Sequence, residues 1–482
     1  MAMGAPAGTA GLQEVEVEAI DVARLEPLVG TERMAHFEDL AETAADALAG
    51  RAVVNINSTA AGGGVAEMLQ TLLAYARGGG VDARWLVIEG DPEFFVITKR
   101  IHNGLYGSPG DGGELGDAER AHYEAVLRRN AERLVTQVGG GDIAIVHDPQ
   151  PAGLSAAIAS AGARVVWRCH VGIDEPNEWS ERSWNFLRPY LESAHGMVFS
   201  RAEFAPSWAD PEGTVVIPPS LDPFGAKNEP MSRRNVRLAL QYAGLLDGGG
   251  PPPPVPFRRR DGSPGHIRRH ADVVRSGPVT PVDAPLVVQA SRWDWMKDMA
   301  GVMEAFAQEV DPAHGAHLVL AGPSVTGVAD DPEAALVFDD CVARWSKLPR
   351  ESRDRVHLAA MPMADNDEQA SIINALQRHA AIVVQKSIAE GFGLTVTEAM
   401  WKARPVVATA VGGITSQIVD GVHGLLVDDP HDLTACGEAI NSLLADRPRA
   451  DDLGRSARTR VTGEFLADRH LEQYAALFAR LQ

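Results

Sequence analysis

Two glutamates eight residues apart form the strongest local pattern in the chain. Glu390 and Glu398 lie in the segment Ser387-Ile-Ala-Glu-Gly-Phe-Gly-Leu-Thr-Val-Thr-Glu-Ala-Met-Trp401. We expect Glu390 in a loop and Glu398 about two turns into a helix, so that both carboxylates point at one elongated ligand. A carboxylate suits a sugar diol because it accepts hydrogen bonds from two neighbouring hydroxyls. An ordinary capped helix with glutamates in its first turns is the alternative, but it leaves the two glycines between them unexplained.

Those glycines indicate a phosphate site at the beginning of the same helix. A helix N-terminus has free N–H groups and the positive end of the dipole, and glycine lets a ligand approach the backbone closely. The residues expected to bind the phosphate-bearing ligand are Gly391, Phe392, Gly393, Leu394 and Thr395.

Two cations five residues apart could hold a diphosphate. Arg292 and Lys297 lie in Ser291-Arg-Trp-Asp-Trp-Met-Lys-Asp298, directly after a short apolar run. Arginine offers a planar fork and lysine a compact charge, and together they can neutralise a leaving diphosphate without a metal. The alternative is that both only keep the surface soluble, but their place after a strand favours the binding role.

A second glycine-rich loop follows the first apolar run of the chain and leads directly into an expected helix. The segment Asn57-Ser-Thr-Ala-Ala-Gly-Gly-Gly-Val65 could bring backbone amides to a phosphate at Gly62, Gly63, Gly64 and Val65. Strand-to-helix turns also use glycine for conformation alone, so this interpretation stays open beside the binding role.

Hydrogen-bonding side chains follow two further apolar runs. His147-Asp-Pro-Gln-Pro151 contains Asp148 and Gln150, and Trp167-Arg-Cys-His170 ends on His170. Such groups can orient a sugar. Single histidines and aspartates are more often structural, but His170 at a strand end favours function.

Short β-branched runs alternate with amphipathic helical segments, which predicts parallel sheets built from βαβ units. The helical segments include 65–77 and 117–138. The expected strands are Ala52–Asn57, Ala83–Ile88, Asp142–His147, Ala163–Arg168, Met197–Ser200, Thr214–Pro218, Pro285–Ala290, His317–Gly322, Arg355–Ala359, Ala381–Gln385 and Pro405–Thr409.

The length of 482 residues and an interruption rich in Pro, Gly and Arg predict two domains. We expect an N-terminal extension at 1–50 packing on a Rossmann-like domain at 51–227. A linker or insertion at 228–284 then leads to a second Rossmann-like domain at 285–460. A C-terminal helix at 461–482 is expected to cross back to the first domain. Open α/β sheets bind ligands at the carboxyl ends of their strands, where all the motifs above lie.

The net charge of −21 opposes binding to nucleic acid and to anionic membranes. Three widely spaced cysteines form no zinc or disulfide pattern and favour a cytoplasmic protein. No signal peptide or membrane span is expected, and Walker, Gly-x-Ser-x-Gly and His-Glu-x-x-His motifs are absent from the sequence.

Together these residues resemble the retaining glycosyltransferases of the GT-B fold, family four, whose Glu-x7-Glu motif matches Glu390 to Glu398. The segments around His147–Pro151, Trp167–His170 and Ile217-Pro-Pro-Ser-Leu-Asp-Pro223 look like those of the trehalose glycosyltransferring synthases and the related trehalose phosphorylases. The resemblance runs from about Ala52 to the C-terminus. It implies two doubly wound domains facing across a cleft, with the acceptor side at 51–227 and the nucleotide-sugar-binding side at 285–460. It also implies transfer of glucose from UDP- or ADP-glucose to glucose with retention, giving α,α-trehalose.

The resemblance also implies roles. Arg292 and Lys297 neutralise the departing diphosphate, Glu398 holds the donor ribose, and Glu390 with the amides of 391–394 holds the donor glucose and phosphates. His170 contacts the transferred sugar, and Asp148 and Gln150 face the acceptor. No catalytic nucleophile is identified, which agrees with front-face attack driven by charge and position.

The same resemblance leaves other functions open. A trehalose phosphorylase, a transferase with another acceptor and a catalytically silent nucleotide-sugar sensor remain alternatives. No cofactor or metal is required, although Mg²⁺ is permitted. The expected partners are small sugars, and a homodimer is compatible with the sequence.

Overall fold

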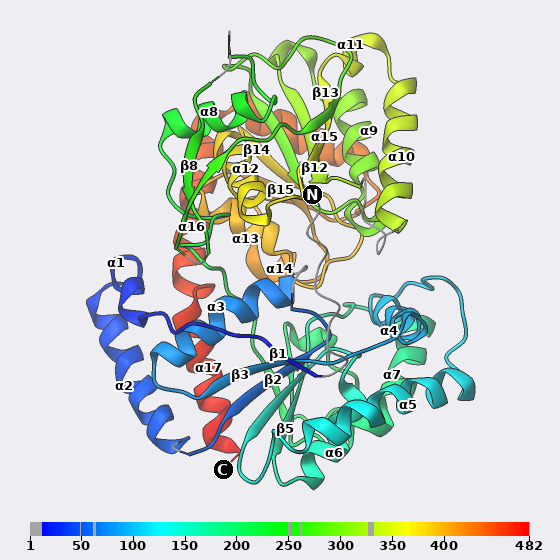
Figure 1. Ribbon diagram of the computed structural model, residues 1–482. Helices are drawn as coiled ribbons and strands as arrows, with labels where there is room; N and C mark the ends of the chain where they lie inside the picture. Colours follow the sequence, from blue (N-terminus) through cyan, green and yellow to red (C-terminus); the bar gives the residue numbers. More distant parts are fainter. Residues whose placement is uncertain are drawn as a thin grey trace, which may run out of the picture. The chain divides into compact units, whose positions relative to one another are not determined.

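The computed structural model describes residues 12–481 except 49, 61–63, 249, 251, 261 and 326–331. The chain divides into two compact units. Unit 1 comprises Met1–Ser220 and Phe465–Gln482, and unit 2 comprises Leu221–Glu464. Each unit contains one seven-stranded sheet of Rossmann type, as the alternating pattern predicts (Figure 1).

The sheet of unit 1 has the strand order β1-β3-β2-β4-β5-β6-β7, with β1 antiparallel and the others parallel. Its strands confirm the expected ones to within about two residues at each end. They are β1 Gln13–Glu14, β2 Val53–Asn57, β3 Ala83–Val87, β4 Ile143–His147, β5 Arg164–Cys169, β6 Gly196–Phe199 and β7 Thr214–Val216.

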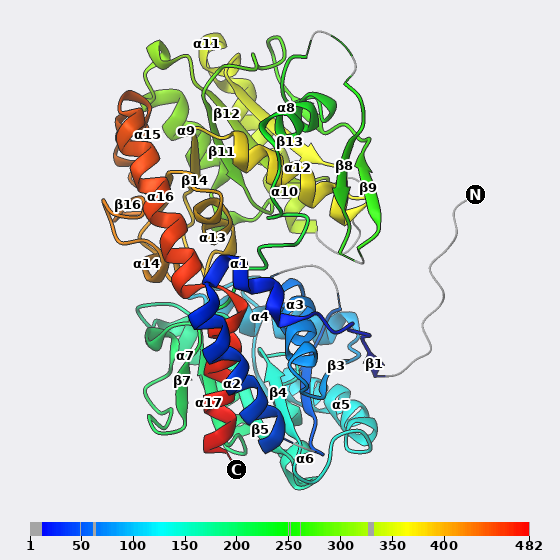
Figure 2. The same ribbon diagram turned by 90° about the vertical axis from the view of Figure 1, so that its left-hand side faces the viewer.

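Helices cover both faces of this sheet because successive strand residues point to opposite sides. In β2, Val53 packs with residues of the last helix, whereas Val54 and Ile56 belong to the core on the other face. Figure 2 shows α2, α3 and α17 on the first side. The unit 1 helices are α1 Glu26–Val29, α2 Thr31–Ala47, α3 Gly64–Gly78, α4 Pro92–Leu105, α5 Asp117–Leu134, α6 Ser155–Ser160, α7 Glu178–Leu191 and α17 Ala467–Arg480, with short 3-10 turns η1 Val22–Leu25, η2 Ala152–Leu154 and η3 Ala202–Phe204.

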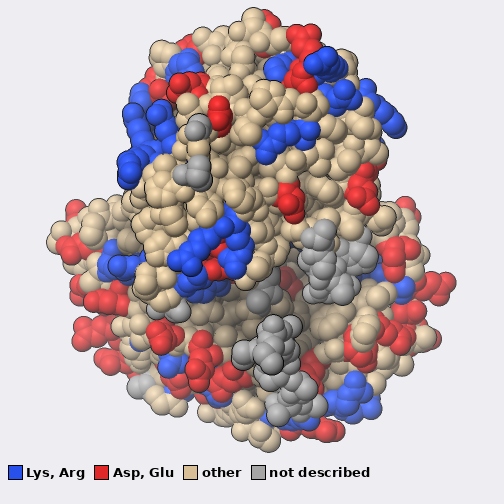
Figure 3. Space-filling model, turned by 45° about the horizontal axis from the view of Figure 1, so that its top comes forward, with Lys and Arg blue, Asp and Glu red and all other residues tan. Residues whose placement is uncertain are grey.

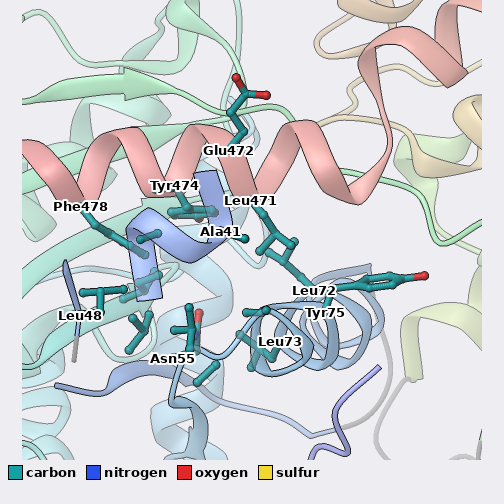
Figure 4. A pocket seen from close by; sticks show the side chains of 18 of the residues that line it. Ala41, Leu48, Asn55, Leu72, Leu73, Tyr75, Leu471, Glu472, Tyr474 and Phe478 are labelled. Carbon is teal, nitrogen blue, oxygen red and sulfur yellow. The ribbon is translucent and has the colours of Figure 1, made fainter. Parts of the chain in front are cut away.

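An apolar pocket of about 70 Å³ lies between α2, α3, α17 and the sheet of unit 1. Leucine and aromatic side chains surround it, and Asn55 of β2 enters it from the sheet (Figure 4). Most of this lining is apolar, so the buried Asn55 amide has mainly apolar neighbours on the pocket side.

The sheet of unit 2 has the order β10-β13-β12-β11-β14-β15-β16, again with one antiparallel edge strand, β10. The six parallel strands follow the 3-2-1-4-5-6 order of dinucleotide-binding folds. The strands are β10 Asp272–Val274, β11 Leu286–Ala290, β12 His317–Pro323, β13 Val356–Met361, β14 Ile382–Gln385, β15 Val406–Thr409 and β16 Leu425–Val427.

A core built from α9, α10 and α15 covers one face of the second sheet. The α8 and α12 helices lie on the other side (Figure 2). The unit 2 helices are α8 Arg233–Tyr242, α9 Met299–Glu309, α10 Pro332–Lys347, α11 Arg350–Arg353, α12 Asn366–His379, α13 Leu394–Trp401, α14 Ile414–Gln417, α15 Leu433–Ala445 and α16 Arg447–Glu464, with η4 Trp295–Lys297 and η5 Pro312–His314.

The segment 228–284 differs from the expected linker, because the structure places it wholly within unit 2. It supplies α8, strand β10 and a hairpin of β8 Val255–Arg258 and β9 Pro264–Ile267. Val255 and Phe257 are buried on one face of the hairpin. Arg259 and Arg260 pair with Asp365 and Asp367 at the start of α12, at 2.6 and 2.9 Å. The prolines and arginines give this segment the composition of a linker. Its alternating buried and exposed residues nevertheless form a hairpin with one buried face.

Charged side chains are mixed on the face shown in Figure 3, where lysines and arginines stand in separate groups beside acidic ones. Among the residues that the structure describes, no helix is long and apolar enough to cross a membrane. The same residues contain no cluster of three or more potential metal ligands.

Candidate active site

The strongest motifs of unit 2 meet where the strand order reverses. Strands β11 and β14 pair in parallel at the centre of the sheet, although β12 and β13 lie between them in the sequence. Residues 291–298 follow β11 and residues 386–393 follow β14. Such a switch point is where open α/β sheets bind ligands, because the two following loops diverge.

Lys297 and Glu390 contact each other directly at this point. Lys297 Nζ donates to Glu390 Oε2 at 2.6 Å, and the Ser387 hydroxyl donates to the same oxygen at 3.1 Å. Glu390 is only 8% exposed. The structure therefore brings together two residues that the sequence predicted for one donor site, and it holds the carboxylate by a cation and a hydroxyl.

Arg292 takes a different partner. Its guanidinium donates to Asp294 Oδ2 at 3.1 Å, and its side chain is 56% exposed. It follows β11 as expected, but no described contact joins it to Lys297 or Glu390.

The loop after Glu390 begins α13 as the sequence predicted. Gly393 is the N-cap, with φ of 86°, a backbone conformation that suits glycine. Phe392 is buried, and the Thr395 hydroxyl donates to Gln385 Oε1 at 3.0 Å. The amides at the beginning of α13 have no side-chain cap. They can therefore receive an anion.

A second loop, containing Gly412 and Gly413, packs against this segment and was not identified from the sequence. A side chain at Gly412 would lie 1.8 Å from the Glu390 carbonyl, and one at Gly413 would lie 2.4 Å from the Phe392 Cα. The Gln417 amide donates to the Phe392 carbonyl. The adjacent glycines after β15 were the signal that could have revealed this packing.

Glu398 lies in the fifth position of α13, just over one turn into the helix rather than about two. It is 4% exposed. Its Oε1 lies 3.4 Å from Lys227 Nζ, whereas its Oε2 has no hydrogen-bond partner among the described residues. A buried carboxylate oxygen without a donor is costly, so this position calls for a ligand hydroxyl. Lys227 was not identified from the sequence.

A buried lysine supports the same helix. Lys402 Nζ donates to Asn228 Oδ1 and Gln377 Oε1, both at 2.8 Å, and to the Glu398 carbonyl at 3.1 Å. Burial lowers the pKa of Lys402 to about 7. Asn228, the first residue of the supposed linker, thus helps to position the C-terminal turn of α13.

The predicted residues of unit 1 follow two neighbouring strands of its own sheet. Asp148 and Gln150 come after β4, which pairs with β2 at the switch point, and His170 comes directly after β5. Asp148 adopts the left-handed conformation, with φ of 64°, which an aspartate tolerates at some cost. Its Oδ1 accepts from the His170 backbone N–H at 2.8 Å. Burial raises the pKa of Asp148 to about 7. Gln150 is partly exposed, and no described bond links it to either residue.

A buried polar cluster lies behind these residues. His147 Nδ1 lies 3.0 Å from His170 Nε2, and Ser220 Oγ lies 2.8 Å from His470 Nδ1. Arg168 is fully buried, and its Nη2 donates to Ser200 Oγ at 3.3 Å. Burial lowers the pKa of the Arg168 guanidinium and of the three imidazoles. Sequence reasoning passed over Arg168 because it is part of a strand.

The second glycine loop lies partly outside the described residues. Gly62 and Gly63 are not described, whereas Gly64 and Val65 begin α3 directly after it. The phosphate role of this loop stays a prediction.

Comparison with known proteins identifies both halves. Residues 55–206 match the family "Trehalose synthase, N-terminal domain", and residues 273–460 match "Glycosyl transferases group 1". The trehalose synthase of Pyrococcus horikoshii is 32% identical over 447 residues, which is 93% of each chain. That of Rubrobacter xylanophilus is 34% identical over 90% of this chain and 91% of the relative.

More distant relatives and solved structures share the architecture. The trehalose phosphorylase of Pleurotus pulmonarius is 24% identical over 85% of this chain and 54% of its own length. The trehalose-6-phosphate synthase OtsA has a TM-score of 0.64 at 13% identity, covering 89% of this chain and 98% of its own. Anabaena HepE in complex with UDP and glucose has a TM-score of 0.59 at 15% identity, covering 89% and 100%.

The identity to the synthases extends over nearly the whole of both chains, and the fold agrees with that of solved GT-B enzymes. The chain is therefore a glycosyltransferase that belongs to the trehalose synthase family and has the GT-B fold.

Proposed function

We propose that this enzyme transfers glucose from a nucleoside diphosphate glucose to free glucose with retention of the α configuration, forming α,α-trehalose. A trehalose-related glycosyltransferase is what the relatives establish. The donor, the acceptor and the stereochemistry are the proposal.

The buried, unpartnered Oε2 of Glu398 carries the proposal of a nucleotide donor. A ribose presents two neighbouring hydroxyls, and each can donate to one carboxylate oxygen. Inorganic phosphate or glucose 1-phosphate has no ribose to offer. A nucleotide sugar therefore satisfies this oxygen better than the phosphorylase substrates do.

The remaining donor contacts follow from charge. Lys297, already at the switch point, and Arg292 neutralise the diphosphate, and the uncapped amides at the beginning of α13 bind its oxygens. Glu390 accepts from hydroxyls of the donor glucose through its second oxygen. UDP in the HepE complex is consistent with such a donor.

The proposed reaction breaks the bond between C1 of the donor glucose and its phosphate oxygen. A new bond forms on the same face from C1 to the anomeric hydroxyl oxygen of the acceptor, and the acceptor proton passes to the departing phosphate oxygen. The products are trehalose and the nucleoside diphosphate. Asp148, Gln150 and His170 bind the acceptor, and His170 also contacts the transferred sugar. Stabilisation of the separating charges supplies most of the rate enhancement.

Product analysis tests this function. The purified protein is incubated with UDP-glucose or ADP-glucose plus glucose, and separately with glucose 1-phosphate plus glucose. We expect trehalose and free nucleotide from the first reaction only, with α,α stereochemistry by NMR of the anomeric protons. Trehalose from glucose 1-phosphate alone would establish a phosphorylase. Nucleotide binding without any transfer would establish a sensor.

Glu398→Ala tests whether the buried Glu398 carboxylate binds the donor ribose. We expect a rise of about 10- to 100-fold in KM for the nucleotide sugar, because a desolvated hydrogen-bond pair is lost. Glu438→Ala, an exposed glutamate on α15, is the matched control. An unchanged KM in the Glu398 variant would remove the ribose assignment.

A further inference from the structure

Three polar side chains form a row across the sheet of unit 1. Strands β2, β4 and β5 are neighbours, and they carry Asn55, His147 and, directly after β5, His170. Asn55 Oδ1 lies 2.9 Å from His147 Nε2, and His147 Nδ1 lies 3.0 Å from His170 Nε2. The two ring planes differ by 13°, with centroids 5.3 Å apart, so the rings lie edge to edge as an in-plane N–H···N bond requires.

Both rings are uncharged in this environment. Asn55 and His147 are each 2% exposed and His170 is 9% exposed. Burial, reinforced by the Arg168 cation, lowers the pKa of His147 to about 3 and that of His170 well below its usual value. A neutral imidazole has one N–H and one bare nitrogen, so each ring can donate only once.

The row then has a direction. The Asn55 amide is oriented with Oδ1 towards His147, and an amide oxygen only accepts. In this orientation His147 Nε2 carries the hydrogen that Asn55 Oδ1 receives. His147 Nδ1 is therefore bare and accepts from His170 Nε2–H. His170 Nδ1 is in turn bare, and it has no partner among the described residues.

The far end of the row lies in apolar surroundings. Asn55 lines the apolar pocket, where Figure 4 shows it between Leu48 and Leu73. Its Nδ2 has no hydrogen-bond partner among the described residues. His147 is thus the group that the Asn55 amide contacts through a hydrogen bond.

We propose that Asn55 and His147 are positioning residues that hold His170 in the Nε2–H tautomer, so that its bare Nδ1 accepts a hydrogen bond from a sugar hydroxyl. This rests on the proposed function, in which His170 contacts the transferred sugar. The row makes the enzyme specific for a sugar that bears that hydroxyl, because a deoxy sugar leaves Nδ1 unpaired. The opposite tautomer would present an N–H and would favour an acceptor group instead.

The tautomer itself can be measured without any turnover. Long-range ¹H–¹⁵N spectra of histidine-labelled full-length protein distinguish the two neutral forms, and His170→Gln assigns the signals. We expect wild-type His170 in the Nε2–H form from pH 8 to pH 5. An Nδ1–H form, or a mixture, would overturn the proposal whatever the enzyme transfers.

Asn55→Leu removes the acceptor while keeping the number and branching of the side-chain heavy atoms, and it should give His170 a mixture of tautomers. Asn57→Leu is the matched control. Asn57 is a buried residue of the same strand, and it accepts from Trp85 Nε1 at 2.8 Å. Its substitution should cost similar stability but leave the His170 tautomer unchanged. If Asn55→Leu also leaves the tautomer unchanged, Asn55 does not set it.

Deoxy sugars connect the tautomer to function. Each monodeoxyglucose is tested as the acceptor. In separate reactions, the nucleoside diphosphate derivative of each monodeoxyglucose is tested as the donor. Wild-type kcat/KM should fall about 10- to 100-fold for the one analogue that lacks the hydroxyl on Nδ1. Asn55→Leu and His147→Phe should lose activity on glucose but not on that analogue. The ratio of kcat/KM for glucose to kcat/KM for the analogue should therefore fall in both variants. Equal losses on all sugars would show only a structural role.

Discussion

Lys297 and Glu390 neutralise each other before any substrate binds, at 2.6 Å between Nζ and Oε2. In the proposed function a bound diphosphate would compete for the same ammonium. The charge of Lys297 is thus already held in place before the reaction. Ser387 keeps the carboxylate oriented when the lysine is shared.

Lys297→Ala should lower kcat by about 10²- to 10³-fold, because a preorganised charge on the leaving group is lost. The melting temperature should fall as well, because Glu390 is left buried with only the Ser387 hydroxyl as its partner. Turnover is therefore measured at a temperature at which the variant is fully folded. Lys347→Ala, on the exposed side of α10, is the control. Wild-type kcat in the folded variant would indicate that Lys297 has only a structural role.

The buried imidazoles make stability depend on pH. Burial lowers the pKa of His147 to about 3 from 6.5, so its contribution is present above pH 6.5 and is lost as the pH falls towards 3. At pH 4 the loss from this residue alone is about 3 kcal/mol. Asp148 acts in the opposite sense. Its raised pKa of about 7 means that its contribution is present below pH 3.8 and is lost as the pH rises through 7.

Burial lowers the pKa of three imidazoles, those of His147, His170 and His470, and these outweigh the one opposing carboxyl. Urea unfolding of the wild type at pH 7, 5 and 4 should therefore show a falling free energy of unfolding. In His147→Gln the fall should be shallower, because one buried group no longer takes up a proton in the unfolded state. Equal slopes in the two proteins would show that His147 does not contribute to the acid lability.

At the scale of elements, a buried network connects the two loops of the donor site. Gln289 of β11 donates to the Lys297 carbonyl at 2.6 Å and accepts from the Lys386 backbone N–H at 3.0 Å. Asp298, with φ of 42°, caps α9 by accepting from Gly301 N–H at 3.0 Å and pairs with the buried Lys386 side chain. The turn after β11 and the turn after β14 are therefore held together.

A double-mutant cycle tests that link. Asp298→Asn keeps the cap and tolerates the left-handed backbone, but it leaves Lys386 buried without a counter-ion, at a cost of about 3 kcal/mol. Lys386→Met should cost a similar amount. The double variant should regain part of the loss in both unfolding free energy and kcat. Additive effects in urea unfolding and in turnover would show that the two side chains are not coupled.

At the scale of the whole molecule, the last helix, α17, belongs to unit 1. The chain enters unit 2 after Ser220 and returns to unit 1 at Phe465. Tyr474, Leu477 and Phe478 of α17 complete the core against β2, β4, β5 and β6. Arg33 of α2 pairs with the buried Asp468 at 2.5 Å. Folding of unit 1 therefore requires the end of the chain.

Phe478→Ala should destabilise unit 1 by about 3–5 kcal/mol, the usual cost of emptying a buried aromatic position. Calorimetry should show one unfolding transition shifted to lower temperature and the transition of unit 2 unchanged. Glu472→Ala, on the exposed side of α17, should shift neither. A shift of both transitions would show that the units unfold as one.

Local pattern determined much of this protein. Hydrophobic periodicity reports which side chains are buried, so the parallel strands from β2 to β7 and from β11 to β15, and helices α3 and α5, were predicted to within a few residues. The edge strands β1, β10 and β16 were not predicted. Glycine and carboxylate spacing likewise located the segment from Glu390 to Glu398, because a helix N-terminus and its ligands are set by neighbours in sequence.

Only the tertiary structure decided which of these segments meet. Strand order places β11 beside β14 and β2 beside β4, and periodicity carries no information about such long-range neighbours. Partner choice also depends on the fold, since Lys297 reaches Glu390 whereas Arg292 turns to Asp294. Polar residues within apolar strands, Asn55, Arg168 and Gln289, gain a role only when a neighbouring strand supplies the group that they contact. The role of these residues depends on which groups lie near them across the sheet, and a single sequence does not contain that distance.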